Sequence, residues 1–200
     1  MKKTALLILT GFFLVAICVS IYAQNKGCLP DALSVIHSRK SVRHFTGEGV
    51  SQDELLTLVK AGMAAPTAVN MQPWSFVIVT ERAKLDALSK ALPYARMLDK
   101  AAAAIIVCAI PEKAFQGKLE IAIIDSSCAG ENILLAAEAL GLGAVWTGVY
   151  PDAGRMDAVR GLFGIPASIV PLNVIPVGHP TSEDKPKDKF KQENVHWEKW

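Results

Sequence analysis

The sequence predicts one globular domain that contains both α-helices and β-strands. Its 200 residues are 51% hydrophobic and 20% charged, a composition that supports a single well-packed core and excludes disorder over most of the chain. Apolar residues at helical spacing and helix-capping residues mark several helices, and short apolar runs mark strands between them. The sequence contains no internal repeat and no linker that would separate a second domain.

The charge balance limits the kind of partner. The formal net charge is +2, and the N-terminal Lys2 and Lys3 account for two of the 21 basic residues, which leaves 19 against 19 acidic residues. A neutral body has no electrostatic footprint for nucleic acid. We therefore expect a small-molecule ligand and no nucleic-acid partner.

Residues 1–23 have the layout of a secretory signal. Two lysines precede an uncharged run from Thr4 to Tyr22, and Ala23 offers a small residue for cleavage. We expect cleavage near Ala23 and export to a periplasmic or other extracytoplasmic location. The run also approaches the roughly 20 residues that span a bilayer, so a membrane anchor formed by residues 4–22 is the alternative. Mass analysis of the N-terminus of the protein from native cell fractions would decide between the two.

Capping residues mark the first two helices of the body, which we place at residues 31–200. Asp31 can cap a short helix through Ile36. Ser51 and Glu54 have the spacing of a capping box, which predicts a helix over 51–65. The apolar face predicted for this second helix consists of Leu55, Leu56, Val59 and Met63.

Strands and helices alternate along the rest of the body. Apolar runs predict strands at 75–80, 103–110, 144–150 and 168–178. Helical patterns predict helices at 82–92, 119–140 and 152–163. The helix at 119–140 is apolar on most sides, so we expect it to be central and buried.

A cluster of cations follows the first helix. Arg39, Lys40, Ser41 and Arg43 place three positive charges around one hydroxyl. Alone, this cluster fits a solvated basic turn as well as a ligand site. As a ligand site, its two guanidinium groups and its hydroxyl could saturate the oxygens of a terminal phosphate, each charge-assisted hydrogen bond contributing about 1.5–3 kcal/mol.

Other patterns carry less information. Gly141 and Gly143 follow a helix and precede a strand, whereas a dinucleotide-binding fingerprint needs a strand before its glycines. The segment APTAVNMQPW fits a structural turn or a loop that offers amide groups to a heteroaromatic ring. The histidines lack metal-ligand spacing, the cysteines form no C-x-x-C pair, and no nucleophile or acid/base pair can be defended. We therefore predict no metal and no catalytic side chain.

Four segments in this order resemble the FMN-dependent nitroreductase family. They are SRKSVRHF, APTAVNMQPWSFVIV, IDSSCAGENILLAAEALGLGAVWTGVYP and VIPVGHPTSEDKPKDKF, and the chain then ends in VHWEKW. The resemblance covers nearly the whole body from Leu33 to Trp200. It implies an α+β nitroreductase-like fold with a central mixed β-sheet flanked by helices. It also implies a homodimer whose two FMN sites lie in the subunit interface.

The resemblance gives the cation cluster a ligand, the FMN phosphate. It implies that Arg39, Ser41 and Arg43 hold this phosphate and that Lys40 lies near the ribityl chain and the polar edge of the ring. Relatives add a basic residue, often arginine, from the C-terminal tail. Here the candidates are Lys187 and Lys189, which keep the charge but lose the bidentate fork of arginine.

The resemblance also implies which residues meet the flavin ring. Pro66, Thr67 and Asn70 would reach it from the partner subunit. One face of the ring would lie along Trp146, Thr147 and Gly148, where a glycine permits close approach of the backbone.

The function implied is that of an NAD(P)H-dependent FMN oxidoreductase. NADH or NADPH would reduce the flavin and leave. A flat electron-poor acceptor such as a nitroaromatic or a quinone would then bind in the same position and be reduced, which is a ping-pong mechanism. The alternative is an exported flavin-binding or electron-transfer module without nicotinamide turnover, because reduced nicotinamides are scarce outside the cytoplasm.

Overall fold

A computed structural model describes residues 30–200 of the chain. The signal or anchor predicted for residues 1–23 lies outside the described residues. The body forms one compact unit over residues 32–200. Within residues 30–200 no helix combines the length and the apolar character needed to cross a bilayer.

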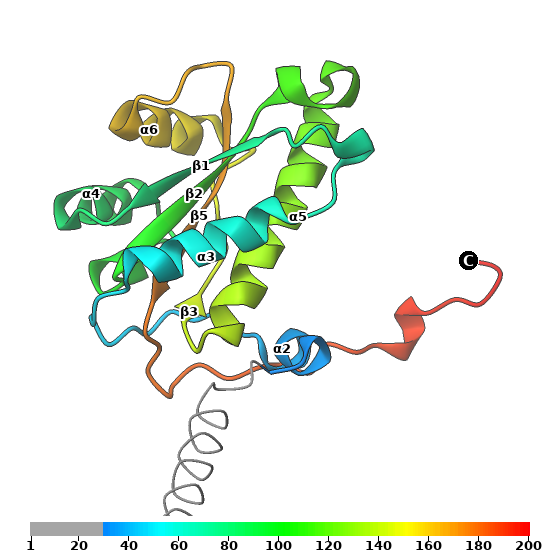
Figure 1. Cartoon of the computed structure of the whole chain (residues 1–200), viewed down its shortest axis with the longest axis horizontal. Helices are drawn as coiled ribbons and strands as arrows, with labels where there is room; N and C mark the ends of the chain where they lie inside the picture. The colour runs from blue at the N-terminus through cyan, green and yellow to red at the C-terminus, as the bar shows by residue number, and fades with distance from the viewer. Residues whose placement is uncertain (1–29) are drawn as a thin grey trace, which may run out of the picture. The chain divides into compact units, whose positions relative to one another are not determined.

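The body consists of helices packed on a β-sheet (Figure 1). The α-helices are α2 (Ala32–Ser38), α3 (Gln52–Met63), α4 (Arg82–Ala91), α5 (Leu119–Ala139) and α6 (Ala153–Phe163). The strands are β1 (Trp74–Val79), β2 (Ala103–Ala109), β3 (Gly143–Ala144), β4 (Thr147–Gly148) and β5 (Val170–Gly178). Every helix predicted from the sequence is present, with ends within a few residues of the expected ones.

The sheet has the strand order β1-β2-β5-β3, and β4 also pairs with β5. The central sheet and the α+β class are confirmed. All pairings within the described residues are antiparallel, so no parallel pair of the expected mixed sheet lies in this part of the chain. Because β5 pairs with three other strands, it fixes the position of most of the sheet.

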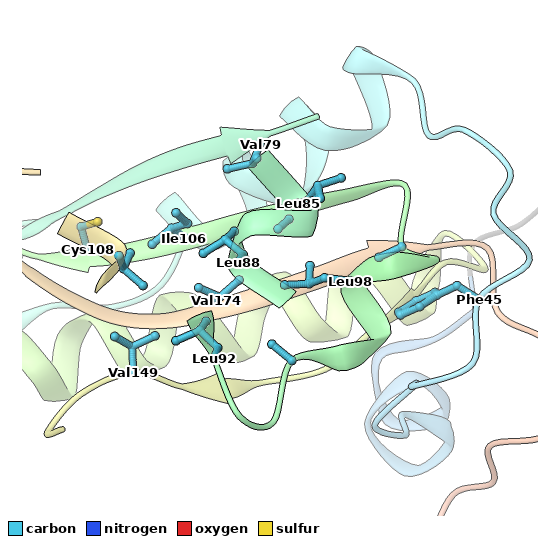
Figure 2. Packing of buried hydrophobic residues seen from close by; sticks show 14 of the residues in the cluster. Phe45, Val79, Leu85, Leu88, Leu92, Leu98, Ile106, Cys108, Val149 and Val174 are labelled. Carbon is cyan, nitrogen blue, oxygen red and sulfur yellow. The ribbon is translucent and has the colours of Figure 1, made fainter. Parts of the chain in front are cut away.

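The alternation of side chains along β2 divides the core into two layers. Ala104, Ile106 and Cys108 contribute to one hydrophobic cluster, with Leu85 and Leu88 of α4, and Figure 2 shows these leucines close to Ile106. The residues between them, Ala103, Ile105 and Val107, contribute to the other cluster, which contains residues of α3 and α5. Successive strand residues point to opposite faces, so helices cover both faces of β2. Each fully buried leucine or isoleucine stabilises the fold by about 1.5–3 kcal/mol.

Helix α3 begins at the predicted capping box. The Ser51 hydroxyl accepts a hydrogen bond from the Glu54 backbone N–H at 3.2 Å, and the Glu54 carboxylate accepts one from the Ser51 N–H at 2.8 Å. The buried face is rotated from the predicted one. It consists of Leu55, Leu58, Val59 and Gly62, whereas Leu56 and Met63 are 48% and 52% exposed. These two residues lie seven apart, on a flank of the helix that residues 30–200 leave exposed.

Helix α5 is central, as expected, but only one stripe of it is buried. The stripe is rich in small residues and consists of Ala122, Asp125, Ser126, Ala129, Gly130, Ile133, Leu134 and Ala137. Small residues allow the helix to lie close to its neighbours. Outside this stripe the helix is partly exposed in the described part of the chain, and Ile124 is 62% exposed.

The prediction of one continuous strand over 144–150 is wrong. The structure has β3 and β4 instead, and both follow one register on β5, with Gly143 opposite Gly178 and Gly148 opposite Asn173. In this register the unpaired Val145 lies opposite Pro176. Proline has no backbone N–H to donate to a neighbouring strand, and the ladder is therefore interrupted at this point.

Gly130 provides a test of the packing between α5 and the sheet. A Cβ at this position would lie 2.6 Å from Trp146 Cζ3 and 3.2 Å from Asn173 Nδ2. Glycine to alanine in a helix interior normally stabilises by about 1 kcal/mol, but overpacking a core costs about 1–3 kcal/mol. We expect Gly130→Ala to destabilise the protein, as measured by the urea midpoint. The matched control is Gly161→Ala in α6, where a Cβ meets nothing within 4 Å and stability should rise. A gain in stability for Gly130→Ala would contradict this packing.

Candidate functional site

The cation cluster lies in an extended segment beside β3. Val42, in the middle of the segment, is 1% exposed, and its N–H donates to the Ala144 carbonyl at 3.0 Å. A Cβ on Gly143 would lie 2.6 Å from Val42 Cγ1, so the glycine makes room for the valine. This contact places Arg39, Ser41 and Arg43 next to the edge of the sheet that carries β3 and β4.

Two of the cations are paired with carboxylates of α5. Lys40 Nζ donates to both carboxylate oxygens of Glu138 at 3.1 Å, and both side chains are largely buried. Arg39 Nε lies 3.1 Å from Glu131 Oε1. Glu138 stands in the last turn of α5, where a negative charge opposes the helix dipole and a nearby cation offsets it. In this structure the Lys40 ammonium is therefore engaged with α5, and its predicted contact with the flavin stays a prediction.

One cavity joins Arg43 to the three residues predicted for the ring. This cavity, which we call the β4 cavity, has a volume of about 460 Å³. Its lining consists of Arg43, Pro93, Tyr94, Arg96, Met97, Val145, Trp146, Thr147 and Gly148. A cavity of this size, with both apolar and cationic walls, suits a cofactor or a small ligand.

Five lining residues were not predicted from the sequence, and one of them, Val145, directly precedes the predicted Trp146. Pro93, Tyr94, Arg96 and Met97 belong to the connection between α4 and β2. Their segment shows no periodicity or motif that indicates a site. Its one usable signal is Arg96, an isolated cation among aromatic and apolar residues.

A second cavity joins Arg39 to the two lysines predicted for the tail. This tail cavity has a volume of about 490 Å³, and its lining includes Arg39, Lys187, Lys189 and Phe190 with Ile36 and His37 at the end of α2. Figure 1 shows the C-terminal segment passing next to α2. Three cations from segments about 150 residues apart in the sequence thus meet at one hollow.

The backbone of β4 is fixed by hydrogen bonds from its own chain, and space remains next to Gly148. Thr147 donates its hydroxyl to the Val174 carbonyl, and Arg155 Nη1 donates to the Gly148 carbonyl at 3.3 Å. The Arg155 guanidinium also lies over the Tyr94 ring, 5.2 Å from its centroid, which links β4 to the opposite wall of the β4 cavity. A Cβ on Gly148 would meet nothing within 4 Å. The chain itself leaves room for a ligand to approach this backbone closely.

A buried amide lies behind this strand. Asn173 is opposite Gly148 on β5 and is fully buried. Its side-chain nitrogen and oxygen have no hydrogen-bond partner among the described residues. Unpaired buried amides are rare in stable cores, and we have no physical account of this one.

The loop predicted to reach the partner's flavin has a strained backbone. Val69, Asn70 and Gln72 have positive φ angles of 46°, 60° and 50°. The Thr67 hydroxyl accepts from the Gln72 N–H at 3.1 Å, and Gln72 Nε2 donates to Asn70 Oδ1 at 3.0 Å. The Ala68 N–H is 3.3 Å from both oxygens of the buried Asp125 carboxylate.

The same loop lies apart from the two cavities. Pro66, Thr67 and Asn70 line neither the β4 cavity nor the tail cavity. Strained, exposed loops of this kind often mark functional positions.

Neither a cluster of metal ligands nor a disulfide is evident in residues 30–200. No group of three or more His, Cys, Asp or Glu in this region could hold a metal ion. Cys108 and Cys128 are free, and burial raises the pKa of the Cys108 thiol to about 12, which keeps it protonated and unreactive at physiological pH.

Comparison with known proteins identifies the family. The model of the "Nitroreductase family" matches residues 36–93 and 86–179. A protein of Archaeoglobus fulgidus, provisionally named an NADH dehydrogenase/NAD(P)H nitroreductase, is 41% identical over 175 residues, which cover 86% of this chain and all of the relative. The chain belongs to the nitroreductase family.

Solved structures agree with this membership. A provisionally named NADH dehydrogenase/NAD(P)H nitroreductase from Parabacteroides distasonis has a TM-score of 0.80 and 43% identity, and the match covers 84% of this chain and 98% of that one. A provisionally named nitroreductase in complex with FMN from Desulfovibrio desulfuricans has a TM-score of 0.73 and 27% identity, and the match covers 86% and 98% of the two chains. The nitroreductase-like fold expected from the sequence is confirmed.

Proposed function

We propose that the protein reduces flat, electron-poor acceptors such as nitroaromatics or quinones, with electrons from NADH or NADPH, through FMN and by a ping-pong mechanism. The coarser assignment rests on the family: the chain is an NAD(P)H-dependent FMN oxidoreductase. The class of electron acceptor and the order in which the substrates bind are our proposal.

The observation that carries the proposal is the β4 cavity. It combines a cation, Arg43, with an open glycine backbone at Gly148 and an aromatic residue, Trp146, in one hollow. A planar ring with an anionic tail matches these three features. Its described lining contains no Ser, Cys, His, Asp or Glu, and the Thr147 hydroxyl donates to the Val174 carbonyl, so the residues present suit binding and orientation rather than covalent catalysis.

The chain's own residues would hold the cofactor at its two ends. Arg39, Arg43, Lys187 and Lys189 would neutralise the phosphate, and the Ser41 hydroxyl would donate a hydrogen bond to it. The backbone of Thr147 and Gly148 would border the ring, and Arg96 would add positive charge to the same cavity. FMN itself supplies the redox chemistry. The protein's contribution is to hold donor and acceptor in turn at about 3–3.5 Å in one place, which is why we expect a ping-pong mechanism.

The first test concerns the phosphate cations. We expect the apoprotein to bind FMN and Arg39→Ala or Arg43→Ala to weaken binding about ten- to a hundred-fold, because each variant loses a charge-assisted contact worth about 1.5–3 kcal/mol. Fluorescence titration of the apoprotein with FMN measures the effect. Lys113→Ala, which removes an exposed cation from the turn Pro111–Lys113, is the control for a general loss of positive charge. Unchanged affinity in both arginine variants would remove these residues from the site.

The second test concerns the reaction. We expect NADH or NADPH to bleach the bound flavin under anaerobic conditions and a nitroaromatic or quinone to restore its colour. Because both substrates would use one cavity, steady-state double-reciprocal plots should give parallel lines as the second substrate is varied. Intersecting lines would exclude ping-pong. A flavin that neither nicotinamide reduces would favour a flavin-binding module instead.

We also propose that the protein is a homodimer with shared FMN sites. Apolar side chains lie exposed on α3, on α5 and on the strained loop, namely Leu56, Met63, Val69, Met71 and Ile124. The loop carrying Pro66, Thr67 and Asn70 meets neither cavity of its own chain. Both observations are explained if a second copy covers these helices and receives the loop.

The third test concerns this assembly. Obligate dimers commonly bury more than about 2,000 Å², so light scattering of the protein without the residues before Gln24 should give the mass of two chains at all accessible concentrations. Met63→Lys should weaken the dimer and release FMN together with it. The control Leu162→Lys changes an exposed apolar residue of α6 and should do neither. A stable monomer that keeps its flavin would refute the shared site.

A further inference from the structure

The C-terminal segment is joined to the cation cluster by an antiparallel backbone contact. Phe45 forms a β-bridge with Pro180. The Thr46 N–H donates to the His179 carbonyl, and the Thr181 N–H donates to the His44 carbonyl, both at 2.9 Å. The chain that leaves β5 therefore runs directly beside the residues that follow Arg43.

Asp184 extends this contact with hydrogen bonds to the backbone of the cation cluster. Its Oδ2 accepts hydrogen bonds from the backbone N–H of Arg43 at 2.9 Å and from that of His44 at 3.1 Å. The same oxygen lies 3.2 Å from His44 Nδ1. The Asp184 side chain is only 14% exposed. Burial by itself would raise the pKa of Asp184, but the bonds from Arg43 and His44 outweigh it and the pKa lies below its usual value, so the group is an ionised acceptor at neutral pH.

The carboxylate engages backbone groups and leaves the ligand-facing groups available. Arg43 Nη1 donates to the Ser41 carbonyl at 3.3 Å, and no described residue takes a hydrogen bond from the Ser41 hydroxyl or from the terminal nitrogens of Arg39. Lys187 and Lys189 follow Asp184 by three and five residues, so the chain can carry them at most about 11 and 18 Å from it. Both lysines line the tail cavity together with Arg39.

We propose that Asp184 is a positioning residue for the phosphate cations: it fixes the Arg43–His44 peptide and anchors the tail so that Lys187 and Lys189 meet Arg39. It acts through these residues and does not touch the ligand. The inference rests on the proposed binding of FMN. The opposite role would be that of a surrogate anion, in which Asp184 occupies the backbone donors and competes with the phosphate. We favour positioning because the groups suited to phosphate, the guanidinium ends and the Ser41 hydroxyl, are not the ones that Asp184 occupies.

The test compares FMN with riboflavin, which has the same ring but no phosphate. Apoprotein variants of the full-length chain are titrated with both flavins, and their folding is checked by circular dichroism. Asp184→Ala should weaken FMN binding about ten-fold, equivalent to about 1.4 kcal/mol, and leave riboflavin binding unchanged. Asp184→Asn retains an oxygen that can accept from the Arg43 N–H and should lose less. It also keeps the test decisive if the alanine variant does not fold.

The matched control is Glu183→Gln. Glu183 is the neighbouring acid and lies 3.5 Å from His44 Nε2, but it makes no described contact with Arg43, and FMN binding should stay within about two-fold of wild type. Equal weakening of FMN and riboflavin by the Asp184 variants would reduce Asp184 to a structural residue and overturn the proposal. Tighter FMN binding would establish it as a competitor. If the wild-type protein binds FMN no better than riboflavin, the phosphate site itself fails, an outcome distinct from failure of Asp184 alone.

Discussion

The backbone hydrogen bonds of β5 determine where the candidate site residues of the described chain lie. This strand pairs with β2 on one side and with β3 and β4 on the other. All nine of its residues are buried. Its continuation past Gly178 pairs with residues 44–46. The wall of the β4 cavity and the segment that carries the cation cluster are therefore both attached to one strand.

This dependence explains how residues far apart in the sequence form one site. Gly148 is placed by its pairing opposite Asn173, and Arg43 is placed by the chain that leaves β5 and reaches Asp184. An interior strand such as β5 is protected from local unfolding, because its backbone bonds are shielded on both edges and both faces. A site attached to such a strand keeps its geometry while the loops around it move.

Local signals predicted the elements well. The capping box of Ser51 and Glu54 marked the start of α3, and Asp152 caps α6 through its bond to the Arg155 N–H. These features depend on residues three or four apart, which a sequence displays directly. The resemblance to the family pointed to the cation cluster and to the residues of β4. In the structure, Arg43 lines one cavity with the β4 residues, and Arg39 lines another with Lys187 and Lys189.

The remaining features depend on long-range contacts. The break between β3 and β4 arises from Pro176, a residue about thirty positions away. The engagement of Lys40 depends on Glu138, and the contribution of Arg96 depends on how the connection after α4 folds back over β4. The exposure of Leu56 and Met63 could not be predicted because hydrophobic periodicity does not distinguish a face that packs inside one chain from a face left for another.

The positive φ angles of the loop after α3 affect how readily a ligand can be bound. Left-handed conformations of non-glycine residues are unfavourable by about 1 kcal/mol or more each, and for a β-branched residue such as Val69 the conformation is a true outlier. Hydrogen bonds to Thr67, Asn70 and Asp125, all from within the chain, hold the loop in this shape. The entropy of ordering the loop is thus lost when the chain folds and not when a ligand arrives. In the proposed site, a loop organised in this way favours fast and reversible exchange of substrates, because no disordered segment has to become ordered in every cycle.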